Sequence, residues 1–308
     1  MTLAYLPRLV CLALACYFLL QAALSAIIWF AAPHAVRAVS SWRPRSAATW
    51  LLTLRLTPAF GAFFGVAVLC VPSYVYFEGR ATEHAGLFCL TAALLSASAF
   101  ALAAWRSGRS LWLCRREFGN PRVGSGPVVI DAPGSLLALA GILKPRVFIS
   151  KRLLAALPAE DLAVALRHEE AHRKAHDNLK RLLLHLAPDP LPCFNPFSTL
   201  EKAWARFSEW AADDEAVDQD PERSLSLAGA LIQYARLGHG AASNLPVSLF
   251  SDQQGFATRI ERLLSAERQI TPSASLLRFL WVPVTAAMLV AEPLLLRPAH
   301  DWLELLMR

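Results

Sequence analysis

Long uncharged runs alternate with charged segments along this chain. Residues 9–32, 56–77 and 85–105 contain no Asp, Glu, Lys or Arg. At about 1.5 Å per residue, each run is long enough to cross a hydrocarbon layer about 30 Å thick as a helix. A fourth run, 279–296, is interrupted by a proline and by Glu292, which lies close enough to one end to reach the headgroups. The pattern therefore predicts four transmembrane helices.

The first run also has features of a secretory signal peptide, because Arg8 precedes it and small residues follow it. A signal peptide, however, has an apolar core of only about 7–15 residues. This run continues through Ile27–Phe30. We therefore expect it to remain in the protein as a transmembrane helix.

Arginines are concentrated beside particular spans. The predicted loop 33–56 holds four arginines and no acidic residue, and four more arginines follow the third span between positions 106 and 116. Loops rich in Lys and Arg stay on the cytoplasmic side. The sequence therefore predicts a multi-pass protein of the cell membrane with its N-terminus outside. Both the 33–56 loop and the block 106–271 are expected inside, and the C-terminal tail outside.

The composition changes this picture only in detail. Charged residues make up 18% of the chain, against roughly 25% in a typical soluble domain. The shortage falls on the two ends, so we expect three parts: 1–105 with three spans, a cytoplasmic domain at 106–271, and 272–308 with the fourth span and a short tail. The net charge of +6 then reflects topology in membrane lipid and not a nucleic-acid partner.

The cysteines and the charged block add the remaining elements. Of six cysteines, four lie within predicted spans, with no spacing typical of a disulfide framework or a cysteine zinc site. Residues 128–130 and 147–149 are short β-rich runs that predict a small sheet or hairpin. Helical patterns follow from Pro158 onward. The predicted fold is mainly α, with about four transmembrane helices and an inserted α+β domain. The later helices of that domain are expected at about 199–218, 222–237 and 256–268.

One segment carries a metal-binding motif, His168-Glu169-Glu170-Ala171-His172. Two histidines four residues apart share one face of a helix, so both imidazoles can bind one zinc ion. Glu169 then lies beside the metal as a general base for the attack of water. The alternative is a polar helix face with incidental histidines.

A catalytic zinc site needs a third protein ligand. His176 lies eight residues beyond His168, about 12 Å along a helix, which is too far to share the ion. Glu209 on the next predicted helix is the better candidate, and Asp213 four residues later is placed to hydrogen-bond a ligand histidine. Glu209 is alternatively one of a run of solvated acids that continues to Glu222.

Two acids near the motif have simpler interpretations. Glu170 is predicted to be a surface charge. Asp177 is predicted to cap a helix or to pair with Arg173 or Arg181, each four residues away.

Together these features resemble the antirepressor membrane metallopeptidases of the BlaR/MecR type and, more distantly, HtpX and the CAAX-processing proteases. The likeness extends over most of the chain, from the three spans through the zinc domain to the fourth span. Its markers are the motif with Asp177 after it, Glu209 with Asp213, and three further segments: ILKPRVFIS at 142–150, Phe194-Asn195-Pro196 and Arg259–Leu264.

The resemblance implies a zinc endopeptidase of the HExxH-plus-Glu class that relays a signal across the membrane by proteolysis. His168, His172 and Glu209 would hold Zn²⁺, and Glu169 would be the base. The expected partner is a protein substrate, often a cytoplasmic transcriptional repressor or the protease itself, and a homo-oligomer is compatible with this role.

The same resemblance gives less specific expectations elsewhere. The strand at 147–149 would be the sheet edge that pairs with an extended substrate. Arg259 either anchors the site or only packs its helix, and Asn195 supports the substrate or the structure. Sensor proteins of this type continue into an extracellular penicillin-binding domain. We do not expect one here, because only about a dozen residues follow Leu296 and no Ser-x-x-Lys occurs in the chain.

Two other functions stay open at this point. One is quality control of membrane proteins, as in HtpX. The other is a non-catalytic membrane sensor or scaffold with a vestigial zinc site. An intramembrane protease is disfavoured, because Arg167, Arg173 and Lys174 flank the motif with charge.

Overall fold

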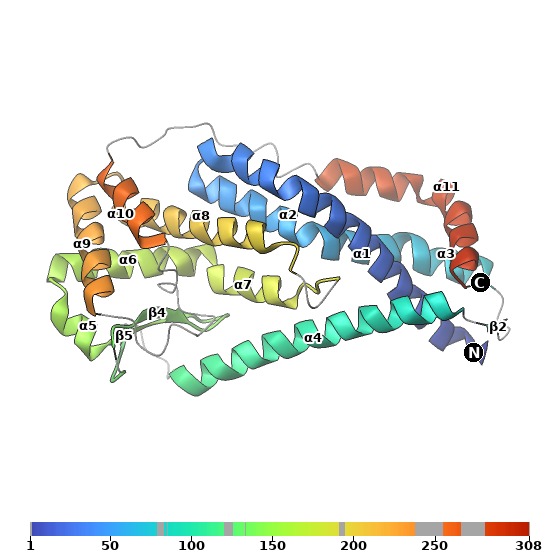
Figure 1. The fold of residues 1–308 in the computed structure, drawn as a ribbon, viewed down its shortest axis with the longest axis horizontal. Coiled ribbons are helices and arrows are strands. Elements are labelled where there is room, and N and C mark those ends of the chain that lie inside the picture. The colour runs from blue at the N-terminus through green and yellow to red at the C-terminus, as the bar shows by residue number, and fades with distance from the viewer. Residues whose placement is uncertain are drawn as a thin grey trace.

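The computed structural model describes residues 2–78, 83–84, 86–119, 126–132, 134–190, 195–237, 255–265 and 281–307. The molecule is elongated (Figure 1). Long helices form one end, where both chain termini lie, and a small sheet with shorter helices forms the other. The chain is mainly helical, as predicted.

The bounds of the described elements follow the chain in order. The helices of the first part are α1 (Tyr5–Ala38), a 3-10 turn (Val39–Ser41), α2 (Pro44–Gly65), a π turn (Val66–Cys70), α3 (Val71–Phe77) and α4 (Leu87–Phe118). The later helices are α5 (Lys151–Ala156), α6 (Ala159–Ala175), α7 (Asp177–Leu186), α8 (Ser198–Val217), α9 (Pro221–Leu237), α10 (Phe256–Leu264) and α11 (Trp281–Met307). The strands are β1 (Thr2–Leu3), β2 (Glu83–His84), β3 (Val128–Ile130), β4 (Leu137–Ala140) and β5 (Arg146–Ser150).

Three helices are long and apolar enough to cross a membrane, which agrees in length and composition with the first three predicted spans. They cover Tyr5–Ser41, Pro44–Phe77 and Leu87–Phe118. Each extends beyond its uncharged run, since a backbone helix need not end where lipid contact ends. The predicted loop 33–56 was wrong for this reason: helix occupies most of it, and Arg55 lies inside α2.

The fourth predicted span, 279–296, overlaps α11. Residues 279 and 280 and several side chains of α11 lie outside the described part of the structure. This span therefore stays a prediction.

The small sheet has the order β3-β5-β4. β5 pairs in parallel with β3 and antiparallel with β4. The expectation that 147–149 form the substrate-binding edge was therefore wrong, because β5 has a partner strand on both sides. Of the two alternatives predicted for 128–130 and 147–149, the small sheet is confirmed and the hairpin is not, because those two strands run parallel.

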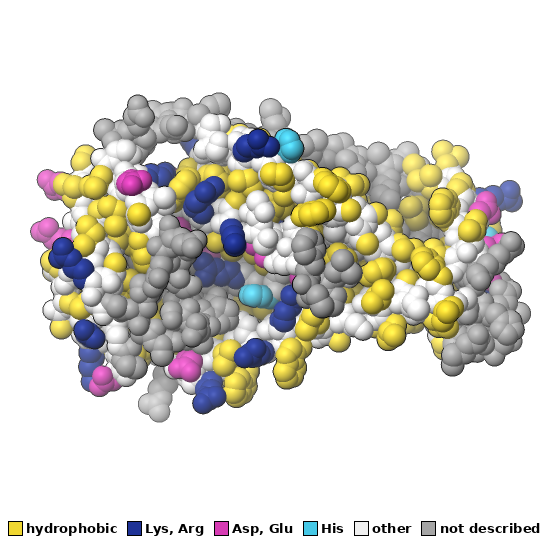
Figure 2. All heavy atoms as spheres, in the orientation of Figure 1, with side chains coloured by type: hydrophobic (Ala, Val, Ile, Leu, Met, Phe, Trp, Pro, Cys, Tyr) yellow, Lys and Arg dark blue, Asp and Glu magenta, His cyan; other side chains and the backbone are white. Residues whose placement is uncertain are grey.

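Helix α8 connects the two ends of the molecule. One of its faces packs on α2 through a core that includes Leu51, Leu200, Trp204 and Phe207. Another face lies along α6, which carries the metal-binding motif. Figure 2 shows Lys, Arg, Asp and Glu side chains mostly over the end that holds the sheet, and hydrophobic side chains over much of the remainder of that face. Helix α8 therefore lies between the apolar helices and the charged domain.

A buried ionic group ties the apolar helices to the segment between α7 and α8. Arg55 on α2 donates from Nη2 to Asp189 Oδ1 at 2.8 Å and from Nε to Glu201 Oε1 at 2.7 Å. Arg106 on α4 donates to the other oxygen of Asp189 at 3.0 Å. We call Arg55, Arg106, Asp189 and Glu201 the junction cluster. Gln21 of α1 reaches the same segment by donating to the carbonyl of Pro188.

Candidate metal centre

Helix α6 presents the motif on its buried side. Pro158 precedes the helix, and Glu160 and Asp161 lie in its first turn, where acidic side chains stabilise the positive end of the helix dipole. Because His168 and His172 are four residues apart, they lie on one face of the helix, and both side chains are completely buried. These histidines are therefore not incidental members of a solvated face.

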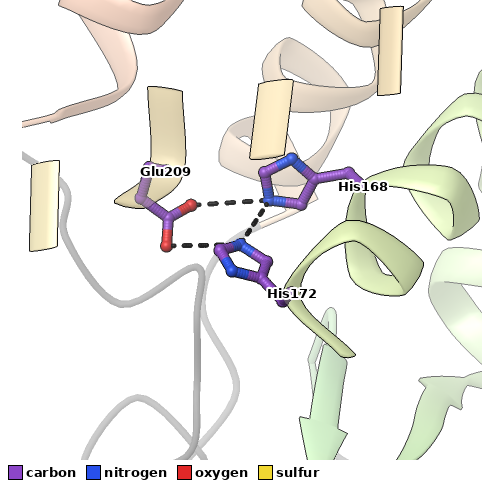
Figure 3. A group of neighbouring side chains, drawn as sticks. All are labelled: His168, His172 and Glu209. Carbon is purple, nitrogen blue, oxygen red and sulfur yellow. Dashed lines mark hydrogen bonds and ion pairs between the residues drawn. The ribbon is translucent and has the colours of Figure 1, made fainter. Parts of the chain in front are cut away.

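Glu209 reaches the two imidazoles from α8 (Figure 3). His168 Nε2 and His172 Nε2 lie 3.1 Å apart. The carboxylate oxygens of Glu209 lie 3.5 Å from the first of these atoms and 3.7 Å from the second. Ligand atoms on a tetrahedral zinc ion at about 2.1 Å are separated by about 3.4 Å. The three side chains thus have the spacing of one face of a metal-ligand tetrahedron.

The other nitrogen of each imidazole faces a carboxylate. His168 Nδ1 lies 3.0 Å from Asp213 Oδ1, and His172 Nδ1 lies 2.7 Å from Asp177 Oδ2. A neutral imidazole that donates its proton from Nδ1 keeps a lone pair on Nε2. Without a metal, a proton on His172 Nε2 can bridge the two Nε2 atoms at 3.1 Å, and a metal ion would take the place of that proton. The donor set therefore fits a metal ion, and the outer carboxylates orient the ligands as they do in known metal sites.

The buried charges shift the titration of these groups. Burial would lower the pKa of His172, but Glu209 and Asp177 outweigh it and raise that pKa to about 9. Burial would raise the pKa of Glu209, but His172 and Arg259 hold it well below its usual range. The carboxylate of Glu209 is therefore ionised, as binding to a metal would require.

Arg259 of α10 closes the far side of the site. It is buried, donates from Nε and Nη2 to the two oxygens of Asp213 at 2.9 and 2.6 Å, and lies 3.0 Å from Glu209 Oε2 through Nη1. Burial would raise the pKa of Asp213, but Arg259 and His168 bring it to about 2. Arg259 thus contacts both Glu209, a candidate metal ligand, and Asp213, which faces His168. These contacts favour a role in anchoring the site over simple helix packing.

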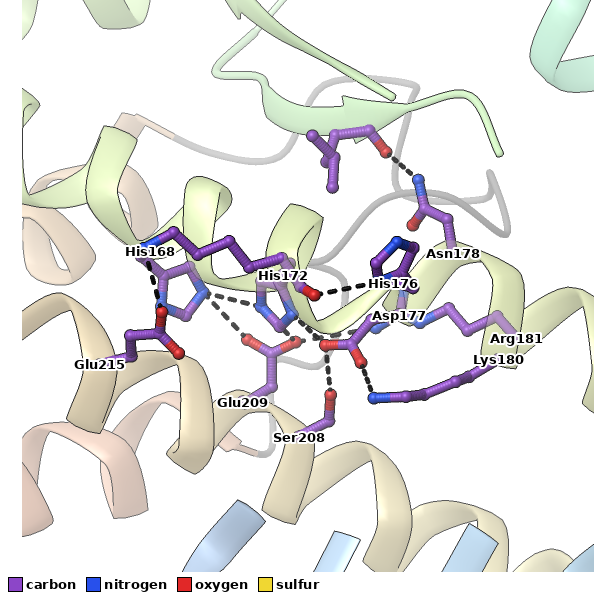
Figure 4. Close-up of polar contacts among 12 residues, drawn as sticks. His168, His172, His176, Asp177, Asn178, Lys180, Arg181, Ser208, Glu209 and Glu215 are labelled. Atoms are coloured by element: carbon purple, nitrogen blue, oxygen red, sulfur yellow. Dashed lines mark hydrogen bonds and ion pairs between the residues drawn. The ribbon is translucent and has the colours of Figure 1, made fainter. Parts of the chain in front are cut away.

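Asp177 has partners that the sequence did not indicate (Figure 4). Besides His172, it accepts hydrogen bonds from Ser208 at 2.9 Å and from Lys180 at 2.8 Å. The predicted pairing with Arg173 or Arg181 was wrong. His176 adopts a left-handed conformation with φ of 57°, so α6 ends there and helical spacing does not continue across Asp177.

The two adjacent glutamates of the motif have different surroundings. Glu170 lies at the surface and pairs with Arg173 at 2.5 Å, as a plain surface charge would. Glu169 is completely buried, and neither of its carboxylate oxygens has a hydrogen-bond partner among the described residues. Burial raises the pKa of Glu169.

Two other residues considered in the sequence analysis, Asn195 and His176, are not among the candidate metal ligands. Asn195 donates to Glu201 at 2.9 Å and accepts from the backbone of Phe197, so it supports the start of α8 within reach of the junction cluster. His176 binds the carbonyl of Lys174 and does not join the metal ligands. Arg181 was not singled out as a site residue, yet its Nη2 lies 3.7 Å from Glu209 Oε1. No periodic signal in the sequence indicates that contact.

The chain was compared with known proteins. No protein-family model, curated protein or solved structure matches it. The functional argument therefore rests on the residues and their geometry.

Proposed function

We propose that this protein is a membrane-embedded zinc endopeptidase with its active site on the cytoplasmic side. Two imidazoles and one carboxylate form a ligand set typical of catalytic zinc, in which the fourth position is left for substrate or water. When bound, such an ion polarises a carbonyl and makes water acidic enough to attack at neutral pH. His168, His172 and Glu209 would hold it.

The unpaired carboxylate of Glu169 is the observation that carries this proposal. Burying a carboxylate without hydrogen bonds costs several kcal/mol, so a purely structural site would gain from a shorter or apolar side chain here. A raised pKa suits a group that takes a proton from water and later delivers it to a leaving amine. Glu169 would perform both transfers, next to the ligand His168 and on the same buried helix.

Arg259 and the outer carboxylates have positioning roles in this scheme. Asp213 and Asp177 keep each imidazole with its proton on Nδ1, which leaves Nε2 free for the metal. Arg259 holds Asp213 and Glu209 together, so the carboxylates of α8 stay aligned with α6.

The sheet suggests how an extended peptide would be presented. β4 is an outer strand of the described sheet, and its contact with α7 brings it near the site, because Asn178 donates to the carbonyls of Leu139 and Gly141 at 2.8 Å. Ser150 N donates to Leu136 O, so along the antiparallel register the backbone groups of Leu137 face away from β5. Asn178 already occupies the outward carbonyl of Leu139, so we propose the Leu137 end of β4 as the segment that pairs with substrate.

The motifs shared with antirepressor metallopeptidases favour a regulated target, such as a repressor or the chain itself. The junction cluster supports this choice, because Arg55 of α2 contacts Glu201 near the start of α8, the helix that carries Glu209, and Arg106 of α4 shares Asp189 with Arg55. A change in those helices has a direct route to a metal ligand.

The test compares purified full-length wild type with Glu169→Gln and, as the matched control, Glu170→Gln. Metal content is measured by mass spectrometry, and cleavage is measured on a peptide library and on the chain itself. We expect zinc in all three proteins, and a loss of cleavage of about 10²-fold or more in Glu169→Gln alone. Leu137→Pro should also weaken cleavage while zinc stays bound, since proline removes an outward backbone donor. Equal cleavage by Glu169→Gln and wild type would refute the proposed mechanism.

A further inference from the structure

Two thiols from different apolar helices meet at the end of the molecule far from the metal centre. Cys11 lies on α1 and Cys89 on α4, and their sulfur atoms are 3.9 Å apart. A disulfide bond is about 2.0 Å long, so the sulfurs are in contact but not bonded. Both cysteines are free.

The surrounding seam makes a thiol at this position informative. The buried positions of α4 lie on one side of the helix and hold only small side chains: Cys89, Ala92, Ala93, Ser96, Ala99, Ala103 and Ser107. Small residues let apolar helices approach closely in membranes. All of these buried positions except Cys89 are occupied by alanine or serine. Cysteine fits the same space but adds redox chemistry, and it does so where a second thiol faces it.

Both cysteines lie near the same ends of their helices. Cys11 follows Arg8 by three residues, about 4.5 Å along the axis, and Arg8 forms a buried ion pair with Glu78 at 2.9 Å. Cys89 lies in the first turn of α4, which begins at Leu87. In Figure 1 these ends lie on the side of the molecule where both termini are found. Polar reagents therefore need not cross the apolar helices to approach the pair.

The exposure of the two thiols is unequal. Cys11 is partly exposed, whereas Cys89 is 1% exposed. A second pair, Cys16 and Cys70, also interacts, but both of its members are buried and Cys16 lies about 7.5 Å further along α1 than Cys11. An oxidant that arrives from the end of the helices meets Cys11 first.

We propose that Cys11 and Cys89 are an oxidisable dithiol that a disulfide compound converts into a covalent link between α1 and α4. Cys11 loses its proton, and its sulfur attacks one sulfur of the oxidant, which releases the other half as a thiol. Cys89 then loses its proton and attacks the Cys11 sulfur of the mixed disulfide, releasing the second half as a thiol. The protein gives up two hydrogen atoms with their electrons, and the oxidant takes both.

The product suits its surroundings. A cystine carries no charge and needs no hydrogen bond, so its burial between apolar helices has no polar cost. The sulfurs need to approach by only about 1.9 Å, which side-chain rotation can supply in part. The link would fix the relative position of two helices, one of which continues to Arg106 in the junction cluster. This inference does not depend on the metal centre or on proteolysis.

The test treats the full-length protein in lipid vesicles with oxidised glutathione and counts free thiols by alkylation and mass spectrometry. Wild type should lose two of its six thiols and give a peptide pair that links Cys11 to Cys89. Cys89→Ser should stop at a glutathione adduct on Cys11. Cys11→Ser should leave Cys89 unmodified. The control Cys114→Ser changes a cysteine of α4 that lies far along the helix from Cys89. It should form the link as wild type does.

Three results would overturn the proposal. The first is wild type that keeps Cys11 and Cys89 reduced under conditions that modify Cys114. The second is a link between Cys16 and Cys70 in place of the proposed one. The third is a glutathione adduct on Cys89 in Cys11→Ser, which would show that the order of attack is wrong.

Discussion

The metal centre and the junction cluster are two groups of buried charge that differ in one respect. In the junction cluster, Arg55 is matched by Asp189 and Glu201, and Arg106 completes the pairing of Asp189. Two basic groups face two acidic groups, and the oxygens that face the arginines are bound. In the metal centre, the Nε2 atoms of His168 and His172 lie 3.1 Å apart, and Glu169 has no hydrogen-bond partner among the described residues.

This difference separates a structural role from a chemical one. Buried ion pairs can hold helices in register without any ligand, and their presence alone indicates no function. A buried carboxylate without a hydrogen-bond partner, such as that of Glu169, is different, because folding removes it from water and offers no hydrogen bond in return. The metal centre leaves the buried carboxylate of Glu169 unpaired among the described residues, whereas both carboxylates of the junction cluster are paired.

The largest expected effect separates the two groups on a single helix. Glu209→Gln removes the charge of a metal ligand, so we expect metal affinity to fall by more than the roughly 10- to 100-fold that loss of an outer partner costs. Glu201→Gln is the matched control, because it makes the same change on α8 within the junction cluster. Metal content after dialysis against a graded chelator measures both. A loss in Glu201→Gln as large as in Glu209→Gln would mean that the two groups are not separate.

The second effect concerns stability. Asp189→Asn leaves the buried Arg55 without its buried carboxylate partner, and we expect the free energy of unfolding to fall by about 3–5 kcal/mol. Replacing both partners, as Arg55→Met with Asp189→Leu, should recover much of that loss, because the buried guanidinium is gone and the remaining charges of Glu201 and Arg106 are partly exposed to solvent. Thermal unfolding in detergent measures the change. The folded fraction of each variant should bind metal as wild type does, and weaker binding would show that the junction cluster shapes the site.

Local patterns explain what could be predicted from the sequence. The first three spans follow from uninterrupted apolar runs, and the shared face of His168 and His172 follows from helix geometry within five residues. Glu209 was a candidate for similar reasons, since it precedes Asp213 by one helical turn. The sequence did not show whether Glu209 is exposed to solvent. In the structure its side chain is buried, with 9% of the residue exposed.

The features that were not predicted from the sequence, such as strand β4, depend on contacts between distant parts of the chain. β4 reads Leu-Ala-Leu-Ala, which has no β-branched residue and no polar alternation, and all four residues are buried. Arg259 meets Asp213 across 46 positions of the chain, beyond the range of any periodic rule. The partners of Asp177 were missed because helical spacing was applied through His176, where the helix ends.

The smallest of these effects tests the outer partners of the ligands. Asp177 is ionised, since His172 and Lys180 hold its pKa below the usual range in spite of burial. Asp177→Asn can still accept the Nδ1 proton of His172 but no longer makes that imidazole more basic. We expect metal affinity to fall about 10- to 100-fold, with zinc competition against a fluorescent chelator as the measurement. Ser208→Ala removes one of the hydrogen bonds that hold Asp177 and should have a smaller effect in the same direction. If Asp177→Asn bound metal as tightly as wild type, the contact between Asp177 and His172 Nδ1 would be structural only. The proposal that Asp177 strengthens metal binding through His172 would then be wrong.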